Sequence, residues 1–209
     1  MKTALDIFII LLLFGAFAAA HSFLATDYVK KNISLRAGNK AAFYRIFYNA
    51  FSVITFAALL EVTPKPDQLV YELRYPWDII FFALQALSLA GAVWSFASMD
   101  FYELSGLNNV KRYFRGTFNP ENPEEGMRLS IKGPHKISRH PAYFFIILFL
   151  AFRAYMNLFF LVFFVCCTAY FFIGAYFEEK KLIRRFGNEY IEYAKRTSKI
   201  FPFKFSKMM

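Results

Sequence analysis

Residues 158–177 read LFFLVFFVCCTAYFFIGAYF, a run of 20 residues without a charge, and Glu178-Glu179 follow directly. A bilayer core of about 30 Å needs about 20 apolar residues in helical form, so this run predicts a membrane-spanning helix. Four other apolar stretches lie at residues 4–20, 43–60, 79–97 and 142–152. We therefore predict an all-α integral membrane bundle of about five transmembrane helices.

The stretch at 142–152 is shorter than the other four. It reaches a spanning length only if its helix begins in the polar segment before it or continues through Arg153. We interpret the fourth and fifth stretches as a helical hairpin that turns at residues 153–157.

The composition excludes an ordinary soluble protein. Hydrophobic residues make up 57% of the 209 residues and charged residues 19%, whereas soluble domains average about 45–50% and 25%. We expect one membrane domain over residues 1–209. Cys166 and Cys167 are adjacent within an apolar run, so we expect no disulfide framework.

The net charge of +10 reflects membrane topology and not a nucleic-acid partner, because the basic residues lie between apolar runs. They gather in residues 27–45, in residues 98–141 and in the tail after Phe177. Five spans place these segments on one side of the membrane. The positive-inside bias predicts that this side is cytoplasmic, in a multi-pass protein of the inner (cytoplasmic) membrane with an external N-terminus.

The first stretch has a competing interpretation. Lys2, the apolar run and Ala18-Ala19-Ala20 are similar to a secretory signal with a small-residue cleavage site. Asp6 is atypical of the positively charged start of such a signal, and removal of the first span would break the charge pattern. We expect the first span to be retained.

Residues 98–141 form the longest segment outside the spans, and long loops are typical of functional regions. The tail after Phe177 predicts a helix, because apolar residues recur there at three- and four-residue spacing. These residues are Leu182, Ile183, Phe186, Tyr190 and Tyr193. We expect this helix to lie on the membrane surface or to fold back over residues 98–141.

The densest polar cluster is Gly133-Pro134-His135-Lys136-Ile137-Ser138-Arg139-His140-Pro141. A hairpin of the last two spans brings it to the same membrane face as Glu178-Glu179. Ionisable groups at that depth are costly and are therefore candidates for function. Purely structural roles stay open for these residues: Lys136 and Arg139 as interfacial anchors, the glutamates as the start of a charged helix, and His140 as a cap before Pro141.

The sequence gives little support to other chemistries. His135 and His140 are five residues apart, which does not align them on a helical face, and no third ligand is near, so we expect no metal site. Phosphate-binding glycine loops and nucleophile turns are missing from the sequence. His21, near the end of the first span, is either a site residue or an ordinary interfacial histidine.

The sequence Ser138-Arg139-His140-Pro141-Ala142-Tyr143, followed by Glu178-Glu179 and the tail through Pro202, resembles the membrane methyltransferases related to isoprenylcysteine carboxyl methyltransferase and phospholipid methyltransferase. Three further segments resemble the methanethiol S-methyltransferase branch. They begin at His21-Ser22, Tyr44-Arg45 and Asp100, and they extend the similarity over most of the chain.

This resemblance implies S-adenosylmethionine (SAM) as methyl donor and a cofactor region at residues 132–202. The cofactor-binding residues that it implies are Lys132, Gly133, His135, Ile137, Ser138, His140, Pro141, Tyr143 and Glu178. The catalytic residues that it implies are Arg139, His140 and Glu179. Within this set, a carboxylate at Glu178 balances the ammonium group of the donor, and aromatic rings suit its sulfonium.

Two departures from the family pattern bear on the acceptor. Prenylcysteine carboxyl methyltransferases carry an arginine four residues before the first glutamate, whereas this chain has Gly174 and no basic residue at 170–177. A thiol needs no such cation, because its thiolate is already a strong nucleophile. The methanethiol branch has a Thr-Pro-x-Met-Thr-like turn between the last two spans, whereas residues 153–157 read RAYMN.

We therefore expect SAM-dependent methyl transfer to a small or lipophilic acceptor, with a thiol as first choice. Methylation of a carboxyl group or a lipid is the first alternative, and a non-catalytic membrane scaffold of the same fold is the second. A reductase on a similar bundle is a remote third. The partners that we expect are the acceptor and membrane lipids.

Overall fold

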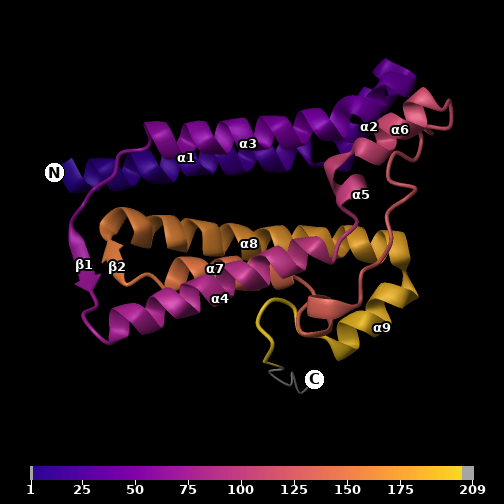
Figure 1. Ribbon diagram of the computed structural model, residues 1–209. Coiled ribbons are helices and arrows are strands. Elements are labelled where there is room, and N and C mark those ends of the chain that lie inside the picture. The colour runs from indigo at the N-terminus through magenta and orange to yellow at the C-terminus, as the bar shows by residue number, and fades with distance from the viewer. Residues whose placement is uncertain (1, 204–209) are drawn as a thin grey trace. The chain divides into compact units, whose positions relative to one another are not determined.

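The computed structural model describes residues 2–203, and the chain divides into two compact units (Figure 1). The first unit comprises Met1–Pro64 and Asp100–Arg128, and the second comprises Lys65–Met99 and Leu129–Met209. Each unit therefore combines two separate parts of the sequence. A single domain over residues 1–209 stays a prediction.

The first unit contains a pair of long helices, α1 (Lys2–Leu24) and α3 (Tyr44–Val62), which run side by side in Figure 1. Shorter helical elements lie outside this pair: α2 (Asp27–Ala37), the 3-10 helix η1 (Gly38–Phe43), α5 (Phe101–Ser105) and α6 (Leu107–Phe114). The long pair confirms the first two predicted spans.

The second unit is built from α4 (Trp77–Ala97), α7 (Pro141–Ala151) and α8 (Leu158–Phe186). In Figure 1, α4 and α7 lie side by side. Gly91 of α4 allows this approach, because a Cβ atom on it would lie 2.4 Å from the ring of Phe145 on α7.

The structure meets neither condition under which the 142–152 stretch would reach a spanning length, and α7 is a shorter apolar helix. Its 11 residues begin at Pro141, which lacks the N–H that a longer helix would need, and end before Arg153. At 1.5 Å per residue the helix is about 17 Å long, little more than half of a bilayer core. After α7 the chain continues as irregular backbone and then as a strand.

That strand, β2 (Tyr155–Asn157), pairs antiparallel with β1 (Leu69–Glu72), which precedes α4. The pairing satisfies backbone groups that a lipid environment would otherwise leave unpaired. The Asn157 side chain then caps α8 by accepting a hydrogen bond of 3.0 Å from the Phe160 N–H. The predicted turn at 153–157 therefore contains a strand that the sequence did not reveal.

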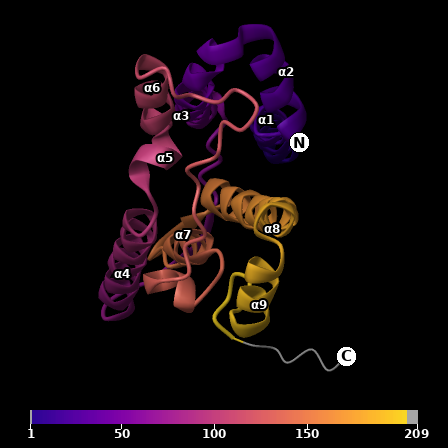
Figure 2. The same cartoon turned by 90° about the vertical axis from the view of Figure 1, so that its right-hand side faces the viewer.

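The tail forms two helices where one was expected. The helix α8 continues past the last apolar residue to Phe186, and Gly187, with φ +55°, ends it. The helix α9 (Asn188–Arg196) follows and lies beside the end of α8 in Figure 2. Tyr193 of α9 donates a hydrogen bond of 2.6 Å to the His135 carbonyl, which confirms that the tail folds back over the 98–141 segment.

Four helical stretches of residues 2–203 are long and apolar enough to cross a membrane, and α7 is a shorter apolar helix. In the second unit, Ile147 of α7, Ala175 of α8 and Ile200 after α9 form a buried cluster. Many large apolar side chains outside such clusters are exposed, as expected for surfaces that face lipid. The fold is an all-α membrane bundle.

Candidate active site

The site begins where the chain enters α7. A 3-10 turn, η2 (Gly133–Lys136), leads to His140, which is the N-cap of α7, and Pro141 occupies the first helical position. The Ser138 hydroxyl accepts a hydrogen bond of 3.1 Å from the His140 N–H. Ser138, His140 and Pro141 are buried, so this entry is a packed feature of the second unit.

A C-terminal strap, residues 197–200, holds this entry in place. The N–H groups of Arg139 and His140 donate to the carbonyls of Ser198 and Lys199 at 2.8 and 3.0 Å. The Ser138 hydroxyl also donates to the Lys199 carbonyl, at 3.0 Å. Residues about 60 positions apart in the sequence therefore form one wall of the site.

The end of the apolar run in α8 supplies two carboxylates. Glu178 accepts a hydrogen bond of 3.1 Å from the Tyr143 hydroxyl, and its side chain is 48% exposed. Glu179 accepts one of 2.6 Å from Arg139 Nε and is 16% exposed. The two neighbours therefore differ: Glu179 is held by the protein, and Glu178 is accessible.

His140 lies between these carboxylates. Its Nδ1 is 3.4 Å from Glu178 Oε2, and its Nε2 is 3.5 Å from Glu179 Oε1. Burial disfavours the charged imidazole, but the two carboxylates outweigh burial and raise the pKa of His140 above its ordinary 6.5. The imidazolium form is therefore favoured.

Three flat rings stack beside the carboxylates. The rings of His140 and Tyr143 are 5.3 Å apart and nearly parallel, at 5°. The Tyr143 ring stacks in turn on Phe171 of α8, at 4.7 Å and 12°. Phe171 and Glu178 are seven residues apart, which places them on one face of α8. A half-exposed carboxylate beside aromatic rings can hold a cationic ligand.

His135 has the opposite electrostatic surroundings. It is 6% exposed, and among residues 2–203 no hydrogen-bond partner of its Nε2 is found. Burial is the main cause that lowers the pKa of His135 below 6.5, which favours the neutral imidazole. Tyr193, which bonds the His135 carbonyl, has its own pKa raised to about 12 by burial.

Arg139 is engaged with the protein itself. Its guanidinium donates to Glu179, to the Ala194 carbonyl at 2.9 Å and to the Thr197 carbonyl. Lys199 adds a second cation 3.5 Å from Glu179. These contacts join α7, α8 and the segment after α9.

The structure brings together most of the residues that the sequence pointed to. Those that meet around the two carboxylates or in the buried entry to α7 are His135, Ser138, Arg139, His140, Pro141, Tyr143, Glu178 and Glu179. Lys132, Gly133 and Ile137 are exposed on the approach to this cluster. Sequence reasoning missed Phe171, which its seven-residue spacing from Glu178 could have revealed, and Lys199, for which no local signal exists.

His21 lies in the first unit. The Tyr48 hydroxyl is 2.7 Å from its Nε2, and the Ser52 hydroxyl is 2.9 Å from its Nδ1. The Ser52 hydroxyl donates to the Tyr48 carbonyl at 2.7 Å, which leaves its oxygen to accept from Nδ1. These bonds tie α1 to α3 within that unit.

Comparison with known proteins finds a similar methyltransferase. Methanethiol S-methyltransferase 1 of Bradyrhizobium diazoefficiens is 31% identical to this chain over 218 aligned residues, which cover 97% of this chain and 69% of the relative. No protein-family model matches the chain, and no solved structure matches it. The membrane bundle and the extent of this identity lead to one conclusion: the chain belongs to the membrane methyltransferase family that includes methanethiol S-methyltransferase 1.

Proposed function

We propose that this methyltransferase uses SAM as donor and methylates the sulfur of a small thiol. The observation that carries the proposal is the half-exposed Glu178 carboxylate beside the stacked rings of His140, Tyr143 and Phe171. The identity with a methanethiol S-methyltransferase supports the same choice of acceptor.

The residues present fit this donor. SAM carries an ammonium group and a sulfonium group, and the cluster offers an accessible carboxylate and aromatic faces, the two features that bind such cations. The buried Nε2 of His135, which has no partner within residues 2–203, is a further polar atom available to a ligand. We assign Glu178 and Tyr143 to the donor's cationic end.

Held by Glu178 and Tyr143, SAM would supply an electrophilic methyl group on its sulfonium, with S-adenosylhomocysteine as the leaving group and the proton of the acceptor thiol released to water. The chain's own residues prepare the site for this. Arg139 and Lys199 hold Glu179, and Glu178 and Glu179 raise the pKa of His140 despite its burial. The Phe171 ring keeps Tyr143 in position to donate to Glu178. Such preorganisation is the main contribution that a protein makes to group transfer.

The region before Glu178 favours a thiol over a carboxylate acceptor. Residues 170–177 contain no basic residue, and a Cβ on Gly174 would lie 3.9 Å from the Tyr143 hydroxyl. A buried carboxylate without a cation is costly, whereas a small thiol is apolar and its thiolate is nucleophilic. Carboxyl methylation therefore stays the less favoured alternative.

We also propose that the site faces the cytoplasm. Basic residues adjoin the site in the sequence, with Lys132, Lys136 and Arg139 at the entry to α7 and the basic tail after Glu179, and the positive-inside bias predicts that such segments are cytoplasmic. The inner membrane is the location that this arrangement supports.

The test is methyl transfer from labelled SAM by the full chain in lipid nanodiscs. Methanethiol, a prenylcysteine carboxylate and phosphatidylethanolamine are offered as acceptors in separate reactions. We expect labelled thioether from the thiol alone. Tyr143→Phe should react roughly tenfold more slowly, because hydrogen bonds to charged groups contribute about 1.5–3 kcal/mol. Tyr155→Phe, which changes an exposed tyrosine of β2, is the control and should react at the parent rate. Label in the carboxylate or the lipid, with none in the thiol, would contradict the proposed acceptor.

A further inference from the structure

The helices α5 and α6 bury their charged side and expose their apolar side. Glu103 of α5 is 5% exposed and pairs with Arg112 of α6. Asn109, also buried, accepts a hydrogen bond of 2.8 Å from Arg112, and Asn108 donates one of 3.0 Å to Glu103. Arg45 of α3 donates to the Glu103 carbonyl at 2.7 Å. These polar contacts hold the helices on the first unit, together with Tyr113 of α6, which packs against the buried cluster of Ala41, Ala42 and Phe118.

Two glycines let the backbone approach the polar side of α5 and α6 closely. At Gly106, which links the two helices with φ +89°, a Cβ atom would lie 2.8 Å from Arg45 Cβ. At Gly126 a Cβ atom would collide with the Glu103–Arg112 pair. Gly126 therefore allows close approach to the ion pair, and Gly106 allows close approach of the α5–α6 link to Arg45.

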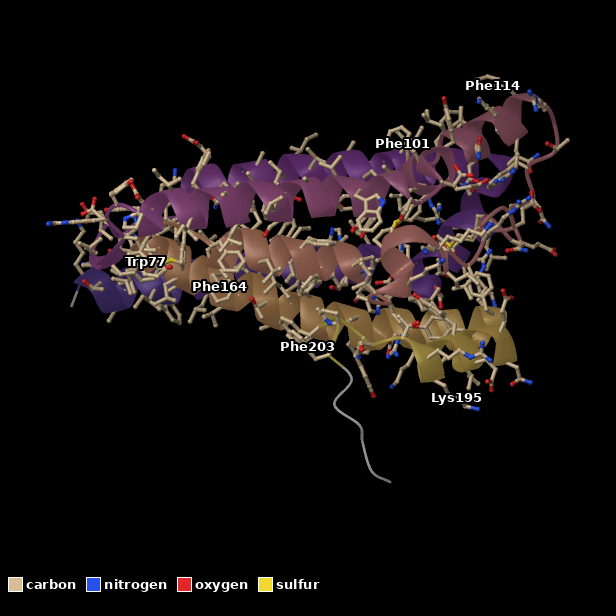
Figure 3. The ribbon with its side chains drawn as sticks, turned by 60° about the horizontal axis from the view of Figure 1, so that its bottom comes forward. Trp77, Phe101, Phe114, Phe164, Lys195 and Phe203 are labelled. Carbon is tan, nitrogen blue, oxygen red and sulfur yellow. The ribbon has the colours of Figure 1, made fainter. Side chains whose placement is uncertain are left out.

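The opposite side is a surface of large apolar side chains. Phe101 is 65% exposed and Phe114 is 76% exposed, and Figure 3 shows both projecting outward from the ribbon. The other exposed apolar residues of these helices are Tyr102, Leu104 and Leu107. Phe43 of η1, itself exposed, meets Phe114 edge to face at 6.3 Å. A segment in water would turn its apolar side inward, so this reversed arrangement indicates an apolar surrounding.

Two cations border the apolar surface. Lys111 lies over the Tyr102 ring at 4.6 Å, and Arg115 directly follows Phe114 and is exposed. Asp100, the nearest acidic residue before α5, is engaged as the N-cap, where it accepts from the Glu103 N–H. Basic side chains around an aromatic and aliphatic face are typical of helices that lie in the surface of an anionic membrane.

The position of α5 and α6 in the chain, directly after a candidate membrane span, indicates that a lipid surface covers their apolar side. The helix α4, one of the membrane-spanning candidates, ends at Ala97, and α5 begins soon after it at Phe101. A segment so close to the end of a span is held at the membrane face. We propose that the α5–α6 surface, formed by Phe101, Tyr102, Leu104, Leu107, Lys111, Phe114 and Arg115, lies in the interfacial layer of the bilayer and binds anionic lipid headgroups.

The first test measures depth. The full chain with Phe114→Trp is placed in nanodiscs whose acyl chains carry bromine at carbons 6–7 or at carbons 11–12, and the fluorescence of the parent, from Trp77 and Trp94, is subtracted. An interfacial helix lies about 5–10 Å into the boundary of headgroups and chains. We expect the shallow bromine to quench the fluorescence of the introduced tryptophan about twofold more than the deep bromine. The control is Glu121→Trp, on an exposed acidic position, which aqueous iodide and not bromolipid should quench.

The second test measures charge. In phosphatidylcholine nanodiscs that contain one-fifth phosphatidylglycerol, bromine is placed on either lipid in turn. Each basic residue near an anionic surface attracts acidic lipid, so brominated phosphatidylglycerol should quench the tryptophan of the Phe114→Trp chain severalfold more per molecule than brominated phosphatidylcholine. Lys111→Glu with Arg115→Glu, added to that chain, should abolish the excess and leave the depth profile unchanged.

Three outcomes would overturn the proposal. Quenching of the introduced tryptophan by iodide and not by bromolipid would place this surface in water. Protection from both quenchers would mean that another protein or a second copy covers it. Equal quenching by the two brominated lipids in the Phe114→Trp chain that keeps Lys111 and Arg115 would show that this surface does not prefer anionic lipid.

Discussion

His135 and His140, five residues apart, are buried in opposite electrostatic surroundings. The carboxylates of Glu178 and Glu179 raise the pKa of His140 above 6.5, whereas burial lowers the pKa of His135 below 6.5. Stabilisation from His140 is therefore complete below pH 6.5 and is lost as the pH rises through its folded-state pKa. Stabilisation from His135 is present above pH 6.5 and is lost as the pH falls from there toward its folded-state pKa.

The opposite pKa shifts of His135 and His140 predict a maximum in thermal stability within about pH 5–8, the range in which histidines titrate. His140→Gln should remove the decline in melting temperature on the alkaline side, and His135→Gln should remove the decline on the acidic side. Melting of the detergent-purified chain across this range measures both effects. Lys136→Gln, at an exposed position between them, is the control and should keep the parent profile. Parent profiles in both histidine variants would contradict the assignment.

Arg139 shows what single residues can and cannot reveal in a sequence. Its type and its place before His140 made it a candidate for chemistry, and the structure shows its guanidinium bonded to Glu179 and to two carbonyls near the end of α9. Those partners lie 40 to 58 residues away, beyond any local pattern. We therefore expect Arg139 to act by positioning Glu179, and that role stays a prediction.

At the scale of elements, apolar length predicted the spans well because the bilayer sets it. The runs at 4–20, 43–60, 79–97 and 158–177 became long helices, since each could reach spanning length by itself. The run at 142–152 could not, and α7 depends instead on its contact with α4 and on the pairing of β2 with β1. Pairings between distant segments leave no periodic signal in the sequence.

The contact of α4 with α7 predicts an unusual response to a small substitution. Gly91→Ala would place a methyl group 2.4 Å from the Phe145 ring, and such overpacking costs about 1–3 kcal/mol. Gly15→Ala in α1 meets nothing within 4 Å and should be neutral or stabilising, because alanine has the higher helix propensity. Melting temperatures of the two variants measure the difference, and Phe145→Leu should partly restore the first. Equal stability of both alanine variants would show that α4 and α7 are further apart.

The α5–α6 pair marks the limit of reasoning from composition. Residues 98–141 contain many charges, and the sequence therefore indicated a polar segment. The structure turns the charged Glu103 and Arg112 inward against each other and leaves Phe101 and Phe114 outward. The identity of a residue does not determine which side of a short helix faces the protein.

At the scale of the molecule, a membrane bundle and a cluster of charges at the end of its spans support one account. The apolar helices hold the chain in lipid, and the start of α7 and the end of the apolar run in α8 bring two carboxylates and the stacked rings of His140, Tyr143 and Phe171 together. Membership of a methyltransferase family supports the proposal that this cluster carries the methyl-transfer chemistry. The central claim is that Glu178 and the rings beside it hold SAM.

Calorimetric titration of SAM into the full chain in nanodiscs tests that claim most directly. The account predicts micromolar binding that Glu178→Gln weakens by at least about tenfold, since a hydrogen bond to a charged group contributes about 1.5–3 kcal/mol. Glu192→Gln, which removes an exposed carboxylate paired with Lys195 on α9, should leave the affinity unchanged. Equal affinity in Glu178→Gln and the parent, or no binding by a folded parent, would contradict the account.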